Sequence, residues 1–195
     1  MGRRDMSEQR KPQIIAAAKR AISQYGIDGA TQERIAEEAG MTRAHIRHYL
    51  GNRDELLDAV WEATVGDYVR EVEQVTAVTG SPSTVGESFE KLLALSFVYE
   101  EDDAVILAFL HESREDERVR ARTHATYAHV EERIAHLLRT AGPALSDADI
   151  ATRAHALMAM SMGALMLDLL NPRAPRAERL IETAASFAPA VVRQD

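Results

Sequence analysis

Apolar residues recur at intervals of three and four along the whole chain, and no stretch alternates with a period of two over a useful length. This spacing is typical of amphipathic α-helices. Glycine and proline fall between the periodic blocks, where they end one helix and allow the next to begin. The pattern predicts an all-α fold of about nine helices, over residues 7–25, 31–39, 42–50, 52–78, 84–99, 102–113, 115–141, 147–170 and 175–192.

The second and third predicted helices have the start and stop signals of a helix-turn-helix. Thr31 and Thr42 each stand where an N-cap belongs. Gly40 follows the second helix directly, at a position where a left-handed backbone costs least without a Cβ. Ile46 and Leu50 are four residues apart, so both should pack into the core from the third helix. We therefore expect a three-helix head over residues 7–53.

The rest of the third helix is polar or small and carries no acid; the residues concerned are Arg43, Ala44, His45, Arg47 and His48. Arginine can donate twice to a guanine edge, histidine can donate or accept, and a small alanine lets the backbone approach. We predict that this helix enters the major groove of DNA with Arg43, His45 and Arg47 at base edges. A cationic surface helix without a target is the alternative.

Net charge supports this interpretation only after the chain is divided. The whole chain carries −8, which by itself argues against nucleic acid. Residues 1–53 hold ten Lys or Arg against six Asp or Glu, whereas residues 54–195 hold thirteen against twenty-five. A basic head on an acidic body attracts DNA at one end and repels it at the other.

The absence of cysteine excludes a disulfide framework and a thiolate metal site. The longest apolar run, residues 156–167, is too short to span a bilayer. We therefore expect a soluble cytoplasmic protein with no membrane partner and no cofactor.

One part of the chain resembles a known family. The residues that carry the likeness are Ile15–Ala18, Gly26, Thr31, Ile35, Ala36, Ala39–Thr42, Ile46, His48–Leu50, Arg53 and Leu56, and together they are similar to the N-terminal signature of the tetracycline-repressor (TetR) family of regulators. The resemblance implies that Thr31, Thr42, Tyr49 and Arg53 hold DNA phosphates. Arg47 and His45 depart from the family pattern, in which a tyrosine and a small hydroxyl residue are usual, so the operator sequence is not carried over. Leu50, where phenylalanine is usual, is a core exchange.

The eighth predicted helix is apolar on nearly all sides, so it should be buried on all sides. A partner chain would cover its second face, and the TetR resemblance implies a four-helix dimer interface from the last two helices of each subunit. The alternative is a helix central to its own monomer. The predicted interface residues are Ala159, Gly163, Met166, Leu170, Ile181, Ala184 and Ala188.

A methionine-rich and aromatic set suits either an adaptable ligand cavity or an ordinary core. Its members are Trp61, Tyr68, Phe109, Tyr127, Met158 and Met162. The resemblance favours a ligand, because family members commonly release DNA when a small molecule separates their heads. Residues 109–170 also loosely resemble the C-terminal domain of choline-responsive repressors, without identifying an effector.

His129, Glu132 and His136 share one face of the seventh predicted helix, and such spacing could bind zinc or support acid–base chemistry. The neighbours Glu131 and Arg133 instead mark a solvent-facing helix. A metal-dependent helical enzyme is therefore the alternative function, and a dimeric scaffold without DNA binding is a third. Our prediction is a non-enzymatic, metal-free, ligand-responsive regulator, most simply a repressor. Its domains would be a helix-turn-helix head at 7–53 and a helical ligand-binding and dimerisation domain at 54–195.

Overall fold

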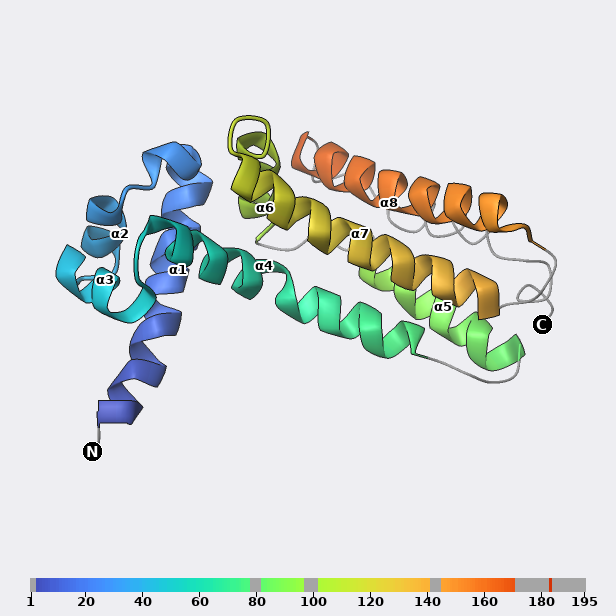
Figure 1. The fold of residues 1–195 in the computed structure, drawn as a ribbon, viewed down its shortest axis with the longest axis horizontal. Helices are drawn as coiled ribbons and strands as arrows, with labels where there is room; N and C mark the ends of the chain where they lie inside the picture. Colours follow the sequence, from blue (N-terminus) through green and yellow to red (C-terminus); the bar gives the residue numbers. More distant parts are fainter. Residues whose placement is uncertain (1–2, 78–81, 97–101, 141–144, 171–182, 184–195) are drawn as a thin grey trace. The chain divides into compact units, whose positions relative to one another are not determined.

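The computed structural model describes residues 3–77, 82–96, 102–140, 145–170 and 183, and all regular structure within them is α-helical (Figure 1). The helices are α1 (Arg3–Gly29), α2 (Gln32–Glu38), α3 (Arg43–Leu50), α4 (Arg53–Thr76), α5 (Pro82–Ser96), α6 (Asp103–Glu112), α7 (Glu117–Thr140) and α8 (Asp147–Leu170). The predicted all-α fold is confirmed. The helices expected first to eighth are present with shifted ends, and the ninth, at 175–192, lies outside the described residues.

Contacts divide the chain into two compact units, which are described separately below. Unit 1 comprises Met1–Asp67 with Glu101–Thr123, and unit 2 comprises Tyr68–Glu100 with His124–Asp195. Helix α4 begins in unit 1 and ends in unit 2. The predicted domain limit after residue 53 marks the end of the helix-turn-helix and not a division between packed cores. It stays a prediction.

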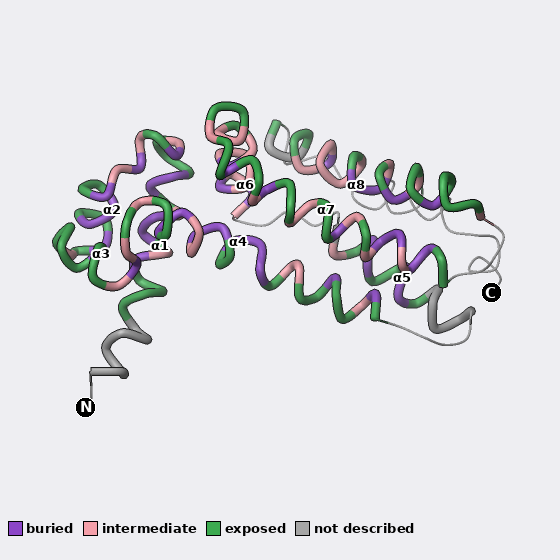
Figure 2. Tube along the Cα trace, viewed as in Figure 1, coloured by how far each residue is buried: buried purple, intermediate pink, exposed green. Residues whose placement is uncertain are grey.

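Helices α1, α2 and α3 of unit 1 share one apolar core, in which Ile14, Ile22, Ile35 and Ile46 are at most 1% exposed (Figure 2). Burial of each such side chain contributes about 1.5–3 kcal/mol to folding. Helix α1 is interrupted at Gly26, where φ is +71°, so the predicted end of the first helix coincides with this break. The head is thus held by apolar contacts that leave the outer face of α3 to solvent.

Helix α6 packs against α1 in the same unit. Phe109 of α6 is fully buried, and its ring lies 5.0 Å from that of Trp61 on α4. The Lys19 ammonium on α1 donates to the Ala63 carbonyl at 3.0 Å and pairs with Asp102, just before α6. One cation therefore links α1, α4 and the start of α6.

The core of unit 2 is formed by the second part of α4 with α5, α7 and α8. Its most buried members, each at most 1% exposed, are Val72, Leu92, Val130, Leu137, Leu138 and Ala154. The Thr76 hydroxyl is buried in it and donates to the Val72 carbonyl at 2.6 Å, while it accepts from Arg133 Nε at 2.9 Å. The core is apolar and this buried hydroxyl is satisfied.

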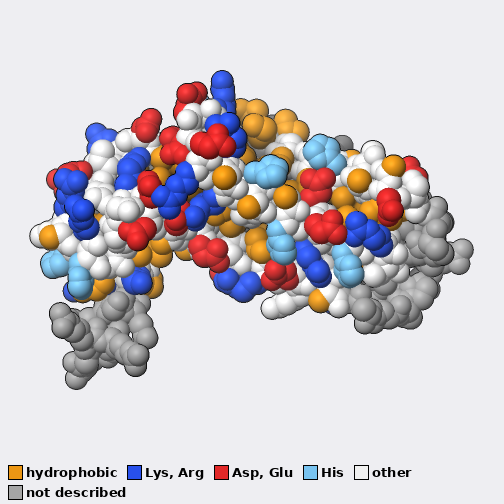
Figure 3. All heavy atoms as spheres, viewed as in Figure 1, with side chains coloured by type: hydrophobic (Ala, Val, Ile, Leu, Met, Phe, Trp, Pro, Cys, Tyr) orange, Lys and Arg blue, Asp and Glu red, His pale blue; other side chains and the backbone are white. Residues whose placement is uncertain are grey.

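Helix α8 buries Ile150 and Leu157 in the unit 2 core, yet Met166 is 56% and Leu170 is 82% exposed. Figure 3 shows apolar side chains gathered at this end of α8. By length and composition alone, Asp147–Leu167 is long and apolar enough to cross a membrane, and 28% of its apolar window is buried. We expected the apolar run to be too short to span a bilayer because that prediction rested on residues 156–167 alone. The helix that contains this run is longer. Exposed apolar surface of this kind marks an interaction face.

Candidate nucleic-acid interface

The helix-turn-helix has the caps that the sequence predicted. The Thr31 hydroxyl accepts from the Arg34 N–H, and the Thr42 hydroxyl accepts from the His45 N–H, each at 3.3 Å. Both threonines have extended backbone, as N-caps do. The two short helices therefore begin where the threonines set them.

The turn between α2 and α3 depends on Gly40, whose φ is +63°. The N–H of Met41 donates to the Ala36 carbonyl at 2.8 Å, and that of Gly40 to Glu37 at 3.0 Å. This is the hydrogen-bond pattern of a Schellman motif, which favours glycine at the left-handed position. A Cβ at Gly40 would meet no described residue within 4 Å, so the positive φ is the reason for a glycine here.

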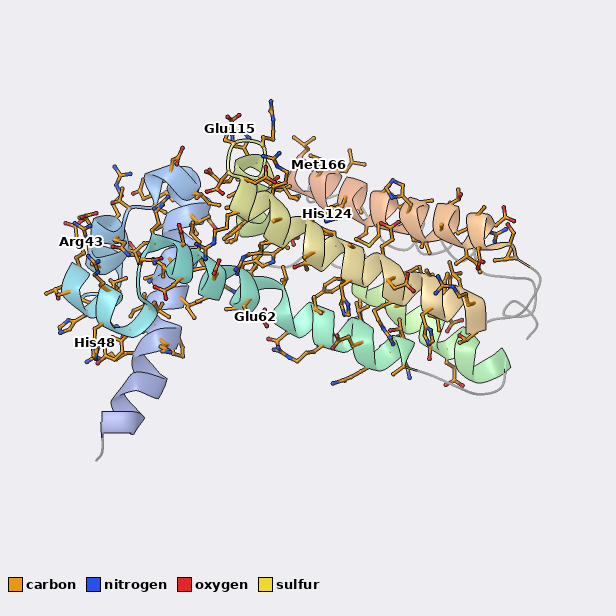
Figure 4. All side chains as sticks on the ribbon, viewed as in Figure 1. Arg43, His48, Glu62, Glu115, His124 and Met166 are labelled. Carbon is orange, nitrogen blue, oxygen red and sulfur yellow. The ribbon has the colours of Figure 1, made fainter. Side chains whose placement is uncertain are left out.

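Helix α3 buries one side and exposes the other. Ile46 and Leu50 lie in the core, as predicted. The exposed residues are Arg43, Ala44, His45, Arg47 and His48, and Tyr49 is partly exposed with its ring 4.9 Å from that of His48. Arg43 and His48 lie toward the two ends of this face (Figure 4). The proposed base-reading side chains thus share one solvent-facing surface.

Arg43 is not isolated on this surface. Its Nη1 pairs with the Glu33 carboxylate of α2 at 2.7 Å, and its Nε donates to Gln32 Oε1 at 3.5 Å. Neither contact follows from the sequence, because both depend on how α2 crosses α3. The sequence does place Glu33 in the first turn of α2, but a glutamate there is equally well explained by its favourable interaction with the helix dipole.

Helix α3 ends at Gly51, with φ +76°, and α4 begins with a capping box. The Asn52 side chain accepts from the Glu55 N–H at 2.9 Å, and the Glu55 carboxylate accepts from the Asn52 N–H at 2.8 Å. A Cβ on Gly51 would collide with the Glu55 carboxylate. Asn52, the first residue of the fourth predicted helix, therefore caps α4.

Arg53 takes a position that the sequence did not indicate. Its guanidinium donates to the backbone carbonyls of Ile27 at 2.6 Å and of Ala30 at 3.1 Å, where α1 gives way to α2. These contacts engage both Nη atoms inside unit 1. The predicted role of Arg53 at a phosphate stays a prediction, and the structure adds a role in holding the head together.

The predicted pocket residues fall in both units. Trp61 and Phe109 pack on each other in unit 1, whereas Met158 is buried in the unit 2 core, with Tyr68 and Tyr127 packed against that core. Met162 is partly buried. Because the two units are separate bodies of structure, the six residues remain a predicted set rather than a defined cavity.

Four of the predicted interface residues are described. Ala159 is exposed, Gly163 is partly exposed, and Met166 and Leu170 are the exposed apolar side chains at the end of α8. The other three, Ile181, Ala184 and Ala188, lie outside the described residues. The exposure of this face is what an interface requires, and the assignment stays a prediction.

Two members of the histidine set contact charged side chains outside it. His129 contacts Glu73 at 2.8 Å, and Glu132 contacts Arg139 at 2.8 Å. The hydrogen bond and the charge of Arg139 lower the pKa of the Glu132 carboxyl. Across the ranges that the structure describes, no group of three or more His, Cys, Asp or Glu could hold a metal ion.

A capped helix-turn-helix with a cationic outer face, followed by a helical body, defines a DNA-binding transcriptional regulator. Residues 14–60 match the bacterial regulatory proteins of the tetR family, and residues 87–193 match the C-terminal region of BetI-type transcriptional repressors. The chain belongs to the TetR family of bacterial transcriptional regulators. The resemblance to the TetR family recognised in the head is confirmed.

Relatives extend over nearly the whole chain. The HTH-type transcriptional regulator BetI of Vibrio parahaemolyticus is 27% identical over 183 residues, which covers 89% of this chain and 87% of that protein. A regulator structure from Pseudomonas aeruginosa PAO1 has a TM-score of 0.79 at 22% identity, covering 95% of this chain and 91% of the other. One from Saccharomonospora viridis, solved in complex with choline, has a TM-score of 0.73 at 20% identity, covering 92% and 95%. At these identities the structures show the shared fold.

Proposed function

We propose that the protein is a cytoplasmic repressor that binds a palindromic operator as a homodimer and leaves it when a small molecule binds its C-terminal helices. One observation carries this proposal: the solvent-facing side of α3 presents Arg43, His45, Arg47 and His48, and the helix contains no acid. Histidine side chains are visible on this surface in Figure 3. Cationic donors on a short exposed helix suit guanine edges and phosphates in a major groove.

The phosphate contacts are assigned to the ends of the two short helices. Thr31 and Thr42 stand at helix N-termini, where backbone N–H groups and the helix dipole favour anions. Tyr49 lies near the end of α3, and Arg53 follows at the start of α4. These residues position the head on DNA without reading sequence.

One recognition helix contacts too few base pairs to select a site, and a dimer contacts twice as many. Two recognition helices related by a two-fold axis read half-sites about one DNA turn apart. The exposed end of α8, with Met166 and Leu170, supports its assignment to the interface. Ala159 and Gly163 on the same helix would allow two copies to approach closely.

The effector is assigned to the region that matches BetI-type repressors. Choline is the first compound to test, because a protein of the same fold was solved with it. Aromatic side chains can hold a quaternary ammonium through cation–π contacts, and Tyr127 is an aromatic member of the predicted set that lies within this region and is only partly buried. Binding there would change the preferred placement of the heads and so lower operator affinity.

The test is selection of bound fragments from genomic DNA, using the wild-type protein, Arg47→Ala and Arg114→Ala. Each variant removes one exposed arginine of unit 1, but only Arg47 lies on α3. We expect the wild type and Arg114→Ala to enrich the same palindrome and Arg47→Ala to enrich a degenerate one. Equal enrichment by all three would remove Arg47 from the reading face. Failure of the wild type to enrich any sequence would refute the proposed function.

A further inference from the structure

Arg43 and Glu33 form an acid–base pair beside the base-reading face. Arg43 is the first residue of α3, and Glu33 is the second residue of α2. Their side chains are each 60% exposed, and Nη1 lies 2.7 Å from Oε1. A carboxylate at this place is unexpected in a DNA-binding head, because it repels the phosphates that the rest of the surface attracts.

A second contact restricts the same guanidinium. Gln32 is 8% exposed, and its Nε2 donates to the Gly51 carbonyl at 3.5 Å, where α3 ends. Its Oε1 accepts from Arg43 Nε, also at 3.5 Å. Glu33 and Gln32 therefore hold the Nε and Nη1 edge of Arg43 from α2, and neither contact uses Nη2.

We propose that Glu33 is a positioning residue that sets operator selectivity through Arg43. This rests on the proposed function. Glu33 holds the guanidinium in one orientation at the start of α3 and keeps it from swinging onto a phosphate. Arg43 then contributes to binding only where a base edge accepts its remaining N–H groups, as the O6 and N7 of guanine do.

The strength of the pair in its two environments fits this role. Between exposed side chains an ion pair contributes about 0–1 kcal/mol, so in the free protein it costs little to rearrange. At a DNA interface water is displaced and the same attraction grows. The Glu33 charge also penalises every complex in which Arg43 gains no base contact, and such a penalty on wrong partners is a source of specificity.

A purely structural role for Glu33 predicts something different. An acid in the first turn of α2 stabilises the helix dipole by about 0.3–1 kcal/mol. Its removal would then lower stability and leave base preference unchanged. The decisive readout is therefore base preference, and stability is measured alongside it.

The experiment compares Glu33→Gln with Glu37→Gln. Both side chains are exposed on α2, and each substitution removes one negative charge. Affinity is measured for the selected operator, for its single-base variants and for random DNA at several salt concentrations. We expect Glu33→Gln to bind random DNA several-fold more tightly, with a salt slope steeper by up to about 0.9. Discrimination should fall about tenfold at the base pair that Arg43 reads. Glu37→Gln should keep that discrimination.

The same substitution in an Arg43→Ala background completes the test. If Glu33 acts through Arg43, Glu33→Gln changes base preference no further there. A loss of preference that persists without Arg43, or one equal to that of Glu37→Gln, overturns the proposal while DNA binding stands. Absence of any sequence preference in the wild type would instead refute the proposed function, and this inference with it.

Discussion

The guanidinium of Arg53, in the first turn of α4, donates to the carbonyl of Ile27 at 2.6 Å across 26 residues of sequence. A second N–H reaches the Ala30 carbonyl at 3.1 Å. One side chain thus fixes the connection between α1 and α2 against the start of α4. The head owes part of its geometry to a residue that family resemblance assigned to DNA alone.

Replacing Arg53 by Ala should lower the free energy of unfolding by about 1–3 kcal/mol, because two carbonyls lose a charged donor. Arg53→Lys should lose less, yet not recover fully, since an ammonium lacks the planar fork that reaches both carbonyls. Urea unfolding of the three proteins measures this. Unchanged stability in Arg53→Ala would show that the carbonyl contacts contribute nothing.

The DNA role of Arg53 is measured separately, at a temperature where both proteins are folded. If Arg53 also holds a phosphate, Arg53→Lys keeps the salt slope and Arg53→Ala lowers it by about one unit. All operator variants should weaken equally. A change in base preference would contradict the phosphate assignment.

Gly163→Leu should weaken the dimer without unfolding the chain. Among the residues that the structure describes, a Cβ at Gly163 meets nothing within 4 Å, so no described neighbour opposes the substitution. At an interface of two α8 helices, overpacking costs about 1–3 kcal/mol. Sedimentation and operator binding should both show the loss.

The matched control is Ala151→Leu, which enlarges another exposed position of α8. Ala151 and Gly163 are twelve residues apart, so at about 100° per residue they lie about 120° apart around the helix axis. We expect it to remain dimeric. A Gly163→Leu protein that stays fully dimeric and bound to operator would move the interface elsewhere.

Glu112 provides a prediction on pH. Burial, and then the negative charges of Asp28 and Asp116, raise the pKa of its carboxyl above 4.5. The folded protein therefore holds this proton more tightly than the unfolded chain does. The charged form opposes folding, so this contribution is favourable at low pH and is lost as pH rises through the folded pKa.

Glu112→Gln should consequently raise the free energy of unfolding at pH 7, and with it the melting temperature. The gain should be less than about 1 kcal/mol because the site is partly exposed. The gain should shrink toward pH 4, because protonation of the wild-type carboxyl removes the charge that opposes folding. Thermal unfolding at the two pH values measures it, with the exposed Glu115→Gln (Figure 4) as the control. A gain that is equal at both pH values would contradict the electrostatic cause.

Local rules predicted the helix-turn-helix well. Thr31, Thr42 and Asn52 cap helices because their side chains reach N–H groups two or three residues on, which depends on sequence alone. Gly40 takes a positive φ for an equally local reason. The burial of Ile46 and Leu50 followed from a spacing of four.

Contacts between distant segments were not predictable in the same way. Pairing of Arg43 with Glu33 depends on the crossing of two helices, and Arg53 meets Ile27 only once the head has folded. The apolar face of α8 was expected from composition, but the second chain that we propose to cover it cannot be identified from contacts within one chain. Aromatic and methionine residues such as Trp61 serve a core and a pocket equally well, so sequence leaves their role open.

The base-reading assignment has its own test. Arg43→Ala should lose about 1–3 kcal/mol at particular base pairs and relax selectivity there. Affinities for a panel of single-base operator variants at two salt concentrations measure this. A uniform loss with unchanged base preferences would move Arg43 to the phosphates and leave reading to His45 and His48.

The central claim is that two heads bind one operator through a cationic face. It is tested most directly by titrating the selected operator with wild-type protein over a range of salt concentrations, with the stoichiometry measured by sedimentation. We predict two chains per palindrome and a log K that falls with log salt by about 0.9 for each phosphate neutralised. A slope near zero, or tight specific binding by a single chain, would contradict it.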